Sequence, residues 1–185
     1  MRGSLPLTAL VVGALALSGC GGEESKGEPE GWKTLRTPRV TVSYPGEWKA
    51  QSAAERGEHT QGAAVVVKDG RTVAKVAVQL RFIKNGDAEM AAAAAMGSVE
   101  LGGRIKGQRK VEVPGTDDAR RVDYTQTGDG KPGKPAKGAK ITGIDVVGVD
   151  SEDAPFLVRV SATEEGASKR TLEKIADSVR VTSGD

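Results

Sequence analysis

Few side chains in this sequence have the chemistry of a catalytic centre. The chain of 185 residues contains one histidine, His59, and one cysteine, Cys20. A Ser-His-Asp triad would have to use His59, which lies in a hydrophilic stretch, and no Gly-x-Ser-x-Gly nucleophile motif occurs. We therefore expect His59 to be a solvated loop residue. No catalytic residue is predicted, and the protein is not expected to be an enzyme.

Carboxylates are the other groups that could do chemistry. A calcium ion could be held by acidic residues at Asp117, Asp118, Asp145, Asp150, Glu152 and Asp153. None of these groups has the spacing of a twelve-residue calcium loop, and zinc ligands are lacking. Glycoside hydrolysis would need two carboxylates about 5 to 10 Å apart across a cleft, and the sequence singles out no such pair. Acidic turn residues are the simpler interpretation, so we predict no metal site and no cofactor.

One segment is locally basic. Residues 128–140 carry one acid, Asp129, and four lysines, Lys131, Lys134, Lys137 and Lys140. Near an anionic surface each lysine gains about 1 kcal/mol of attraction, so these lysines are candidates for contact with lipid headgroups or wall polymers. The simpler interpretation is a long, mobile and solvated loop stiffened by proline.

The N-terminal residues indicate export from the cytoplasm. Arg2 precedes a mostly apolar run over residues 5–17, and Ser18 and Gly19 lead to Cys20. A standard signal peptide ends in small residues of the Ala-x-Ala kind, whereas Leu-Ser-Gly-Cys resembles the lipobox of bacterial lipoproteins. The resemblance implies that residues 1–19 are removed and that lipid on Cys20 anchors the protein to the outer face of the cell membrane. The apolar run is shorter than the about 20 residues of a spanning helix.

The residues after Cys20 resemble a spacer. Residues 21–31 contain glycines and charged residues and no apolar side chain, so we expect residues 20–31 to be a flexible tether with a span of about 20 Å. Residues 32–185 suit a single domain with one core. The chain has 27 basic and 25 acidic residues, and this near-neutral balance argues against a nucleic-acid partner.

Alternating apolar residues predict most of the strands. Residues 40–44 alternate, and Pro45-Gly46 then leads into residues 48–50, which predicts a first hairpin. Residues 63–67 and 75–82 flank an Asp-Gly turn, which predicts a second hairpin. Further strands are expected around residues 111–113 and 122–124, and over residues 141–149 and 156–162.

Two helices are predicted from their caps and apolar spacing. Asp87 is expected to cap a helix that runs to about residue 101. Its packing face should be the stripe of Met90, Ala94, Gly97 and Leu101. Ser168 is expected to cap a second helix with a buried stripe of Leu172, Ile175, Ala176 and Val179. Antiparallel strands with helices between them predict an α+β domain.

Two short signatures carry a resemblance to a known family. The first is a strand followed by Tyr-Pro and a tryptophan, over residues 39–48, and the second is a helix that runs into a strand, over residues 175–181. Together they resemble the two ends of the PsbP-like α/β/α sandwich proteins of the Mog and LpqN type. This resemblance implies a mostly antiparallel sheet packed by helices, and a binding or assembly module. The matched positions are core and turn residues, so no functional residue is carried over.

These observations favour one function and leave two alternatives open. The first is a membrane-anchored, non-enzymatic module that interacts with another protein of the cell envelope. The second is a lipoprotein that binds a lipid or a cell-wall fragment. The third is an unrecognised envelope hydrolase, which would use clustered Asp or Glu residues.

Overall fold

The computed structural model describes residues 29–182. Cys20, the lipobox and most of the predicted tether lie outside this part. The elements run in the order β1 (Trp32–Arg36), β2 (Val40–Pro45), β3 (Lys49–Ala50), the 3-10 turn η1 (Ala53–Glu55), β4 (Thr60–Lys68), β5 (Arg71–Leu80), α1 (Ala88–Glu100), β6 (Gly103–Val113), β7 (Thr116–Thr127), β8 (Lys140–Val149), β9 (Pro155–Thr163), α2 (Lys169–Asp177) and β10 (Arg180–Val181). Neither helix is long and apolar enough to cross a bilayer.

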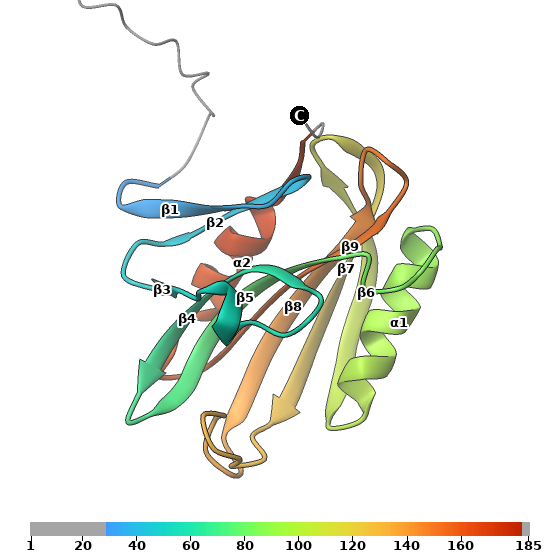
Figure 1. Cartoon of the computed structure of the whole chain (residues 1–185). Coiled ribbons are helices and arrows are strands. Elements are labelled where there is room, and N and C mark those ends of the chain that lie inside the picture. Colours follow the sequence, from blue (N-terminus) through green and yellow to red (C-terminus); the bar gives the residue numbers. More distant parts are fainter. Residues whose placement is uncertain (1–28, 183–185) are drawn as a thin grey trace, which may run out of the picture.

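A seven-stranded sheet forms the centre of the fold (Figure 1). Its strand order is β3-β4-β5-β9-β8-β7-β6, and every neighbouring pair is antiparallel. The second predicted hairpin is confirmed as β4–β5. Asp69 and Gly70 join its strands with φ values of 50° and 71°, which is the left-handed backbone that a tight two-residue hairpin turn requires. Antiparallel strands combined with two helices confirm the predicted α+β class.

A second sheet has three strands in the order β1-β2-β10. The first predicted hairpin is wrong, because β2 pairs with β1 and β10, whereas β3 pairs with β4 in the large sheet. Trp48 explains the difference. Its side chain is 3% exposed and packs in the core, so the chain after Pro45 crosses from one sheet to the other and does not fold back.

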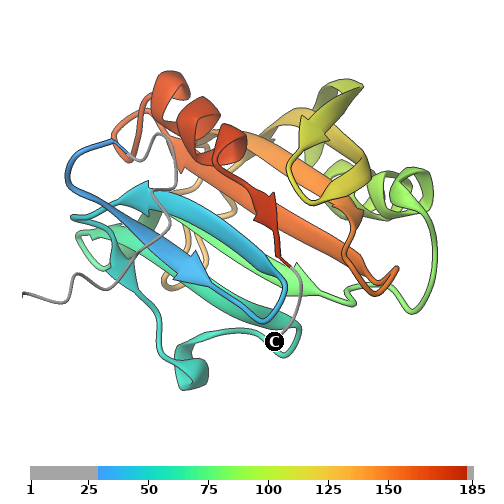
Figure 2. The same cartoon turned by 90° about the horizontal axis from the view of Figure 1, so that it is seen from above.

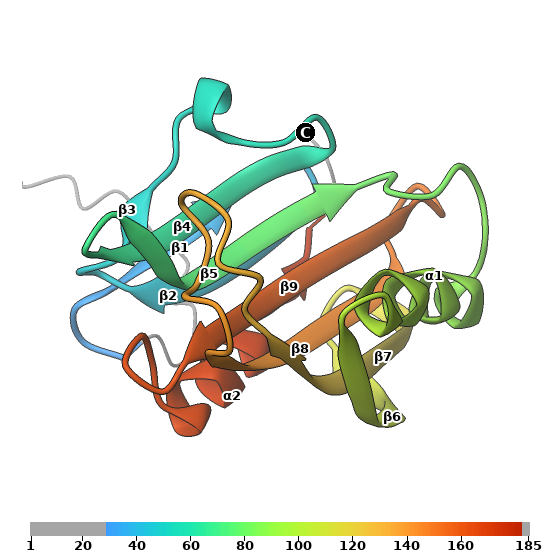
Figure 3. The same ribbon diagram turned by 90° about the horizontal axis from the view of Figure 1, so that it is seen from below.

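The helices cover opposite faces of the large sheet (Figures 2 and 3). The face covered by α2 and the small sheet contains the larger apolar cluster, which includes Val76, Phe156, Val158 and Ile175. We call it the α2 face. The opposite face, called the α1 face, contains a smaller cluster in which α1 meets Val122 and other residues of β7, β8 and β9. The fold therefore has three layers.

Both predicted helices are present and capped as expected. Asp87 accepts a hydrogen bond from the backbone N of Met90 (2.9 Å), and Ser168 accepts one from the backbone N of Thr171 (3.1 Å). The stripe predicted for the second helix is buried, although Val179 follows the end of α2. In α1 the predicted packing face is wrong, since the buried residues are Ala88, Ala91, Ala92, Ala95 and Val99. Small side chains let α1 approach the sheet closely, and the larger Met90 and Leu101 point outward, 57% and 92% exposed.

Candidate functional site

The single histidine and the first acidic pair lie apart from one another. His59 is exposed in the turn before β4, as expected. Asp117 and Asp118 lie at the start of β7, and the Asp118 carboxylate is 4.0 Å from the Lys110 ammonium. No group of three or more metal-ligating side chains occurs within residues 29–182.

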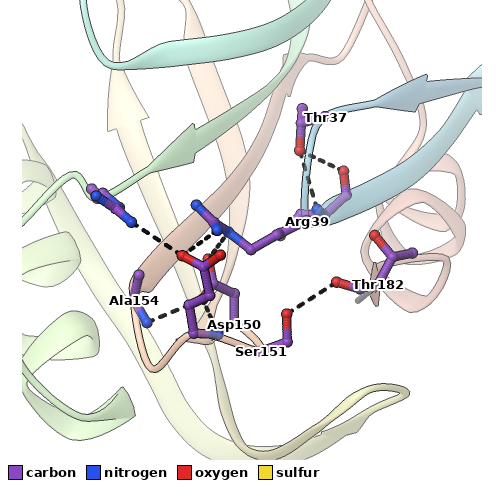
Figure 4. A network of polar contacts seen from close by, with 9 residues as sticks. Thr37, Arg39, Asp150, Ser151, Ala154 and Thr182 are labelled. Atoms are coloured by element: carbon purple, nitrogen blue, oxygen red, sulfur yellow. Dashed lines mark hydrogen bonds and ion pairs between the residues drawn. The ribbon is translucent and has the colours of Figure 1, made fainter. Parts of the chain in front are cut away.

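The acidic residues of the β8–β9 turn form an ion-pair network with two arginines (Figure 4). Arg39 Nε lies 2.8 Å from Asp150 Oδ2, Arg39 also pairs with Glu152, and Arg81 Nη2 is 3.2 Å from Glu152 Oε2. Asp150 Oδ1 accepts hydrogen bonds from the backbone N of Glu152 (2.9 Å) and of Ala154 (3.1 Å). This network joins the small sheet to the turn.

Asp145 is fully buried on the α1 face and paired with Arg159. The guanidinium donates to both carboxylate oxygens, Nε to Oδ1 at 2.8 Å and Nη2 to Oδ2 at 2.5 Å. Arg159 Nη2 also donates to Ser98 Oγ (2.9 Å) and Ala95 O (3.3 Å) on α1. Burial raises the pKa of Asp145, and the Arg159 hydrogen bonds oppose that rise. The pair therefore ties α1 to the sheet.

The basic segment is folded onto the β4–β5 hairpin (Figure 3). Gly133 O accepts from the backbone N of Thr72 (3.1 Å), and Lys134 O accepts from Arg71 Nη1 (3.4 Å). Hydrogen bonds within residues 128–139 close further turns. The segment is thus a series of hydrogen-bonded turns that lies across the large sheet.

A groove of about 650 Å³ opens on the α1 face beside this segment. We call it the lysine groove. Its walls are the end of α1 at Leu101, the turn around η1, and the loop of residues 128–135, and its floor is formed by β5 and β9. The structure separates the four predicted lysines, because Lys131 and Lys134 line the groove whereas Lys137 and Lys140 do not.

Lys75 also lines the groove, and the sequence interpretation overlooked it. It alternates with the core residues Ala74 and Val76 of β5, so its side chain lies on the α1 face. A lysine in the middle of a strand with apolar neighbours was the available signal. Alternation identifies the buried face of the strand but does not show that the opposite face borders a groove.

A row of side chains continues from Lys75 across the sheet. Lys75 is paired with Ser161, Ser161 with Gly143, and Gly143 with Tyr124 on successive strands. The Tyr124 ring lies over Gly143, where an added Cβ would be 2.1 Å from Tyr124 Cζ. The hydroxyls of Tyr124 and Ser161 are hydrogen-bonded, and burial raises the pKa of Tyr124. A polar floor therefore connects the groove to the buried ion pair.

The charges of the groove are only partly balanced. Asp129 pairs with Lys131 at 3.1 Å, and Glu55 accepts hydrogen bonds from the Ser52 backbone N and hydroxyl, both at 2.8 Å. Within residues 29–182, no carboxylate lies at ion-pair distance from Lys75 or Lys134. Burial lowers the pKa of Lys75, and the charge of Lys134 lowers it further.

The groove has the size and polarity of a binding site. The groove is lined by lysine ammonium groups, hydroxyls, amides and the carboxylates of Glu55 and Asp129, and His59 is not among the residues that line it. Its volume lies within the range of about 300 to 1,000 Å³ that is usual for small-molecule sites.

No family model matches the sequence, and no curated protein sequence matches it. A solved structure from Bacteroides thetaiotaomicron is similar over 82% of this chain with 13% identity and a TM-score of 0.47, and this chain spans about half of that protein, 49%.

Two solved structures are similar over most of both chains. Cyanobacterial PsbP (CyanoP) from Synechocystis has a TM-score of 0.54 with 11% identity and covers 90% of this chain and 99% of its own. LpqN, which is involved in cell envelope biogenesis of Mycobacterium tuberculosis, has a TM-score of 0.51 with 14% identity, over 82% of this chain and 90% of its own. The described domain therefore has the PsbP-like fold.

Proposed function

We propose that this protein is a lipid-anchored, extracytoplasmic and non-enzymatic binding module that presents its α1 face to a partner in the cell envelope. The observation that carries the proposal is the lysine groove, an open and incompletely neutralised site on the α1 face. The lipobox-like residues that end at Cys20 support the anchor.

The position of the tether supports a partner on the α1 face. The chain enters the domain through β1, in the small sheet, which lies on the α2 face (Figure 2). The residues that line the lysine groove lie on the opposite face. A module tethered through β1 can therefore hold its groove away from the attachment point, where a partner can reach it. Lys131 and Lys134 of the basic segment are therefore better placed to bind a ligand in the groove than to contact the anchoring bilayer.

The buried acids support a non-enzymatic role. Asp145 and Asp150 are the buried carboxylates of the described residues, and each is paired with an arginine. Such pairs hold elements together and are not poised to exchange protons. The likeness to LpqN, a protein of cell envelope biogenesis, adds support for the envelope as the site of action.

Photo-crosslinking in native membranes tests this proposal. A photoreactive amino acid replaces Leu101, which is 92% exposed at the rim of the groove. The matched control places it at Lys174, which is exposed on α2 at the opposite face. We expect irradiation to give a reproducible adduct of defined mass from position 101 and none from position 174.

Equal adducts at both positions would show contact without a preferred face and would contradict the proposal. Absence of any adduct from several positions around the groove would do the same. An activity against envelope glycans that was lost on substitution of Asp145 or Asp150, with the fold intact, would instead establish the hydrolase alternative.

A further inference from the structure

The strongest unexplained feature of the molecule is the meeting of two lysines in the groove. The arginines that are mostly buried beside an acid are neutralised in the structure, as Arg39 is by Asp150 and Arg159 by Asp145. Lys75 and Lys134, in contrast, both line the groove and lie close enough for their charges to interact, and neither has a carboxylate of the described residues at ion-pair distance. Two like charges in a half-buried site destabilise the fold unless an anion joins them.

The chain holds both lysines in place by its backbone. Lys75 lies in the middle of β5, between β4 and β9, where Val65 and Ser161 are its partners on the two sides. Lys134 lies in the loop that Thr72 and Arg71 bind through the carbonyl oxygens of Gly133 and Lys134. A flexible loop could move its charge away from Lys75, but these hydrogen bonds keep the segment above the floor of the groove.

We propose that the lysine groove binds a phosphate group between Lys75 and Lys134. This inference deepens the proposed function and rests on it, because it names the ligand chemistry of the same surface. Lysine ammonium groups bind phosphate as point charges, and hydrogen bonds to charged groups are stronger than neutral ones. The volume of about 650 Å³ exceeds that of phosphate alone, so the ligand is a phosphorylated small molecule or the headgroup of a lipid.

Polar groups around the lysines suit the rest of such a ligand. Gln51 Oε1 is buried at the groove without a hydrogen-bond partner among the described residues. A buried acceptor without a donor is costly, and a ligand hydroxyl next to the phosphate would satisfy it. Thr72 and Ser161 also line the groove, so it offers a phosphate site with hydroxyl-binding groups beside it.

Titration of the full-length protein in an uncharged detergent tests the phosphate site. The probes are inorganic phosphate and glycerol 3-phosphate, followed by calorimetry, and vesicles of phosphatidylglycerol against vesicles of phosphatidylcholine, followed by flotation. Lys75→Gln is expected to weaken binding about tenfold, as the loss of a hydrogen bond to a charged group does. Lys134→Gln is expected to weaken it about threefold, because that lysine is more exposed to solvent screening.

Lys137→Gln is the matched control, since it removes the same charge from the same loop outside the groove. We expect it to leave the affinity within about twofold of wild type. Lys75→Arg should restore part of the affinity lost in Lys75→Gln, which separates the loss of charge from a general packing defect. Near-identical unfolding midpoints for the three glutamine variants keep the comparison valid.

The two probe types identify the source of the phosphate. Lys75-dependent binding of glycerol 3-phosphate supports a free phosphorylated molecule, and Lys75-dependent binding of phosphatidylglycerol vesicles alone supports a lipid headgroup. An equal loss in Lys75→Gln and Lys137→Gln would reveal diffuse attraction and overturn the inference, as would no binding of any probe. In either of those cases a specific adduct at position 101 would leave the proposed function standing. Lys75-dependent phosphate binding without any adduct would contradict the protein partner and not the phosphate site.

Discussion

The two faces of the seven-stranded sheet are covered in different ways. On the α2 face, a helix and a second sheet close over a large apolar cluster in which Phe156 and Ile175 are fully buried. On the α1 face, one helix covers β6, β7, β8 and part of β9, and its buried residues are mostly alanines. The Asp145–Arg159 pair lies against α1, and the row from Lys75 to Tyr124 leads from there to the lysine groove.

The two faces contribute differently to the stability of the fold and to ligand binding. Burial of apolar area contributes about 25 cal/mol per Å² and accumulates over the α2 face. Buried ion pairs contribute little net stability, because the desolvation of both charges offsets their attraction. The polar groups of the α1 face therefore orient α1 and the groove, while the α2 face holds the fold together.

The largest expected effect is that of Phe156→Ala. Phe156 is 0% exposed in the α2-face cluster, and loss of a buried phenyl group leaves a cavity that costs about 3 to 5 kcal/mol. Urea denaturation monitored by circular dichroism measures the change in the free energy of unfolding. A loss below about 1 kcal/mol would mean that the α2 face does not dominate stability.

Asp145→Asn is expected to lower the free energy of unfolding by somewhat less, about 3 kcal/mol, because it leaves the half-buried Arg159 guanidinium without its counter-charge. The double variant Asp145→Leu with Arg159→Met should recover most of the loss, since it removes both charges. The same denaturation experiment applies to all three proteins. If the double variant were as unstable as the single one, the pair would be a net stabilising feature, and the contrast between the two faces would weaken.

Patterns within a segment predicted most of the fold. The alternation of Val76, Val78 and Leu80 identified β5, the Asp69-Gly70 turn fixed its hairpin, and Asp87 and Ser168 mark both helix starts. These signals are local, since turn geometry and capping depend on neighbouring residues. The resemblance carried by the two chain ends matched the observed fold.

The incorrect predictions concern features that depend on contacts between distant segments of the chain. The pairing of β2 with β1 and β10 depends on residues up to 141 positions apart, which the Pro45-Gly46 turn does not encode. The face that α1 buries was mispredicted because hydrophobicity favoured Met90 and Leu101, whereas close packing favoured alanines. Residues 29–31 were assigned to the tether, yet Gly31 O accepts a hydrogen bond from the Gly46 backbone N (3.0 Å).

The site was predicted in part. The basic loop was identified from its composition, but two of its four lysines lie outside the groove. Lys75 comes from a strand about 60 residues away, and only the register of β5 and the folding of the loop bring it near Lys134. Chain composition gives charge, whereas a site needs the tertiary placement of that charge.

Lys75→Met is expected to raise the free energy of unfolding slightly, on the order of 0.5 kcal/mol at pH 7. Since the pKa of folded Lys75 lies below the unfolded value of 10.5, charging it destabilises the folded state at neutral pH. That penalty disappears as the pH rises through the folded pKa toward 10.5, so the advantage of Lys75→Met should shrink between pH 7 and pH 10. Lys137→Met, as control, should show neither the gain nor its pH dependence. A lower free energy of unfolding in Lys75→Met would mean that the lysine side chain stabilises the fold through its contacts, which would contradict this prediction.

The smallest expected effect on stability is that of Cys20→Ser, because Cys20 precedes the part of the chain that forms the two faces. Two lipid chains anchor a protein stably, at about 0.8 kcal/mol per buried CH₂ group, so removal of the lipidated thiol should release the protein from membranes into the soluble fraction. Its urea midpoint should equal that of the lipidated protein in uncharged detergent.

The affinity of Cys20→Ser for glycerol 3-phosphate, and its dependence on Lys75, should also be unchanged, since the groove lies on the face opposite the entry of the tether. Continued membrane association of Cys20→Ser would contradict the lipobox, and weaker phosphate binding by the released protein would mean that the membrane contributes to the groove.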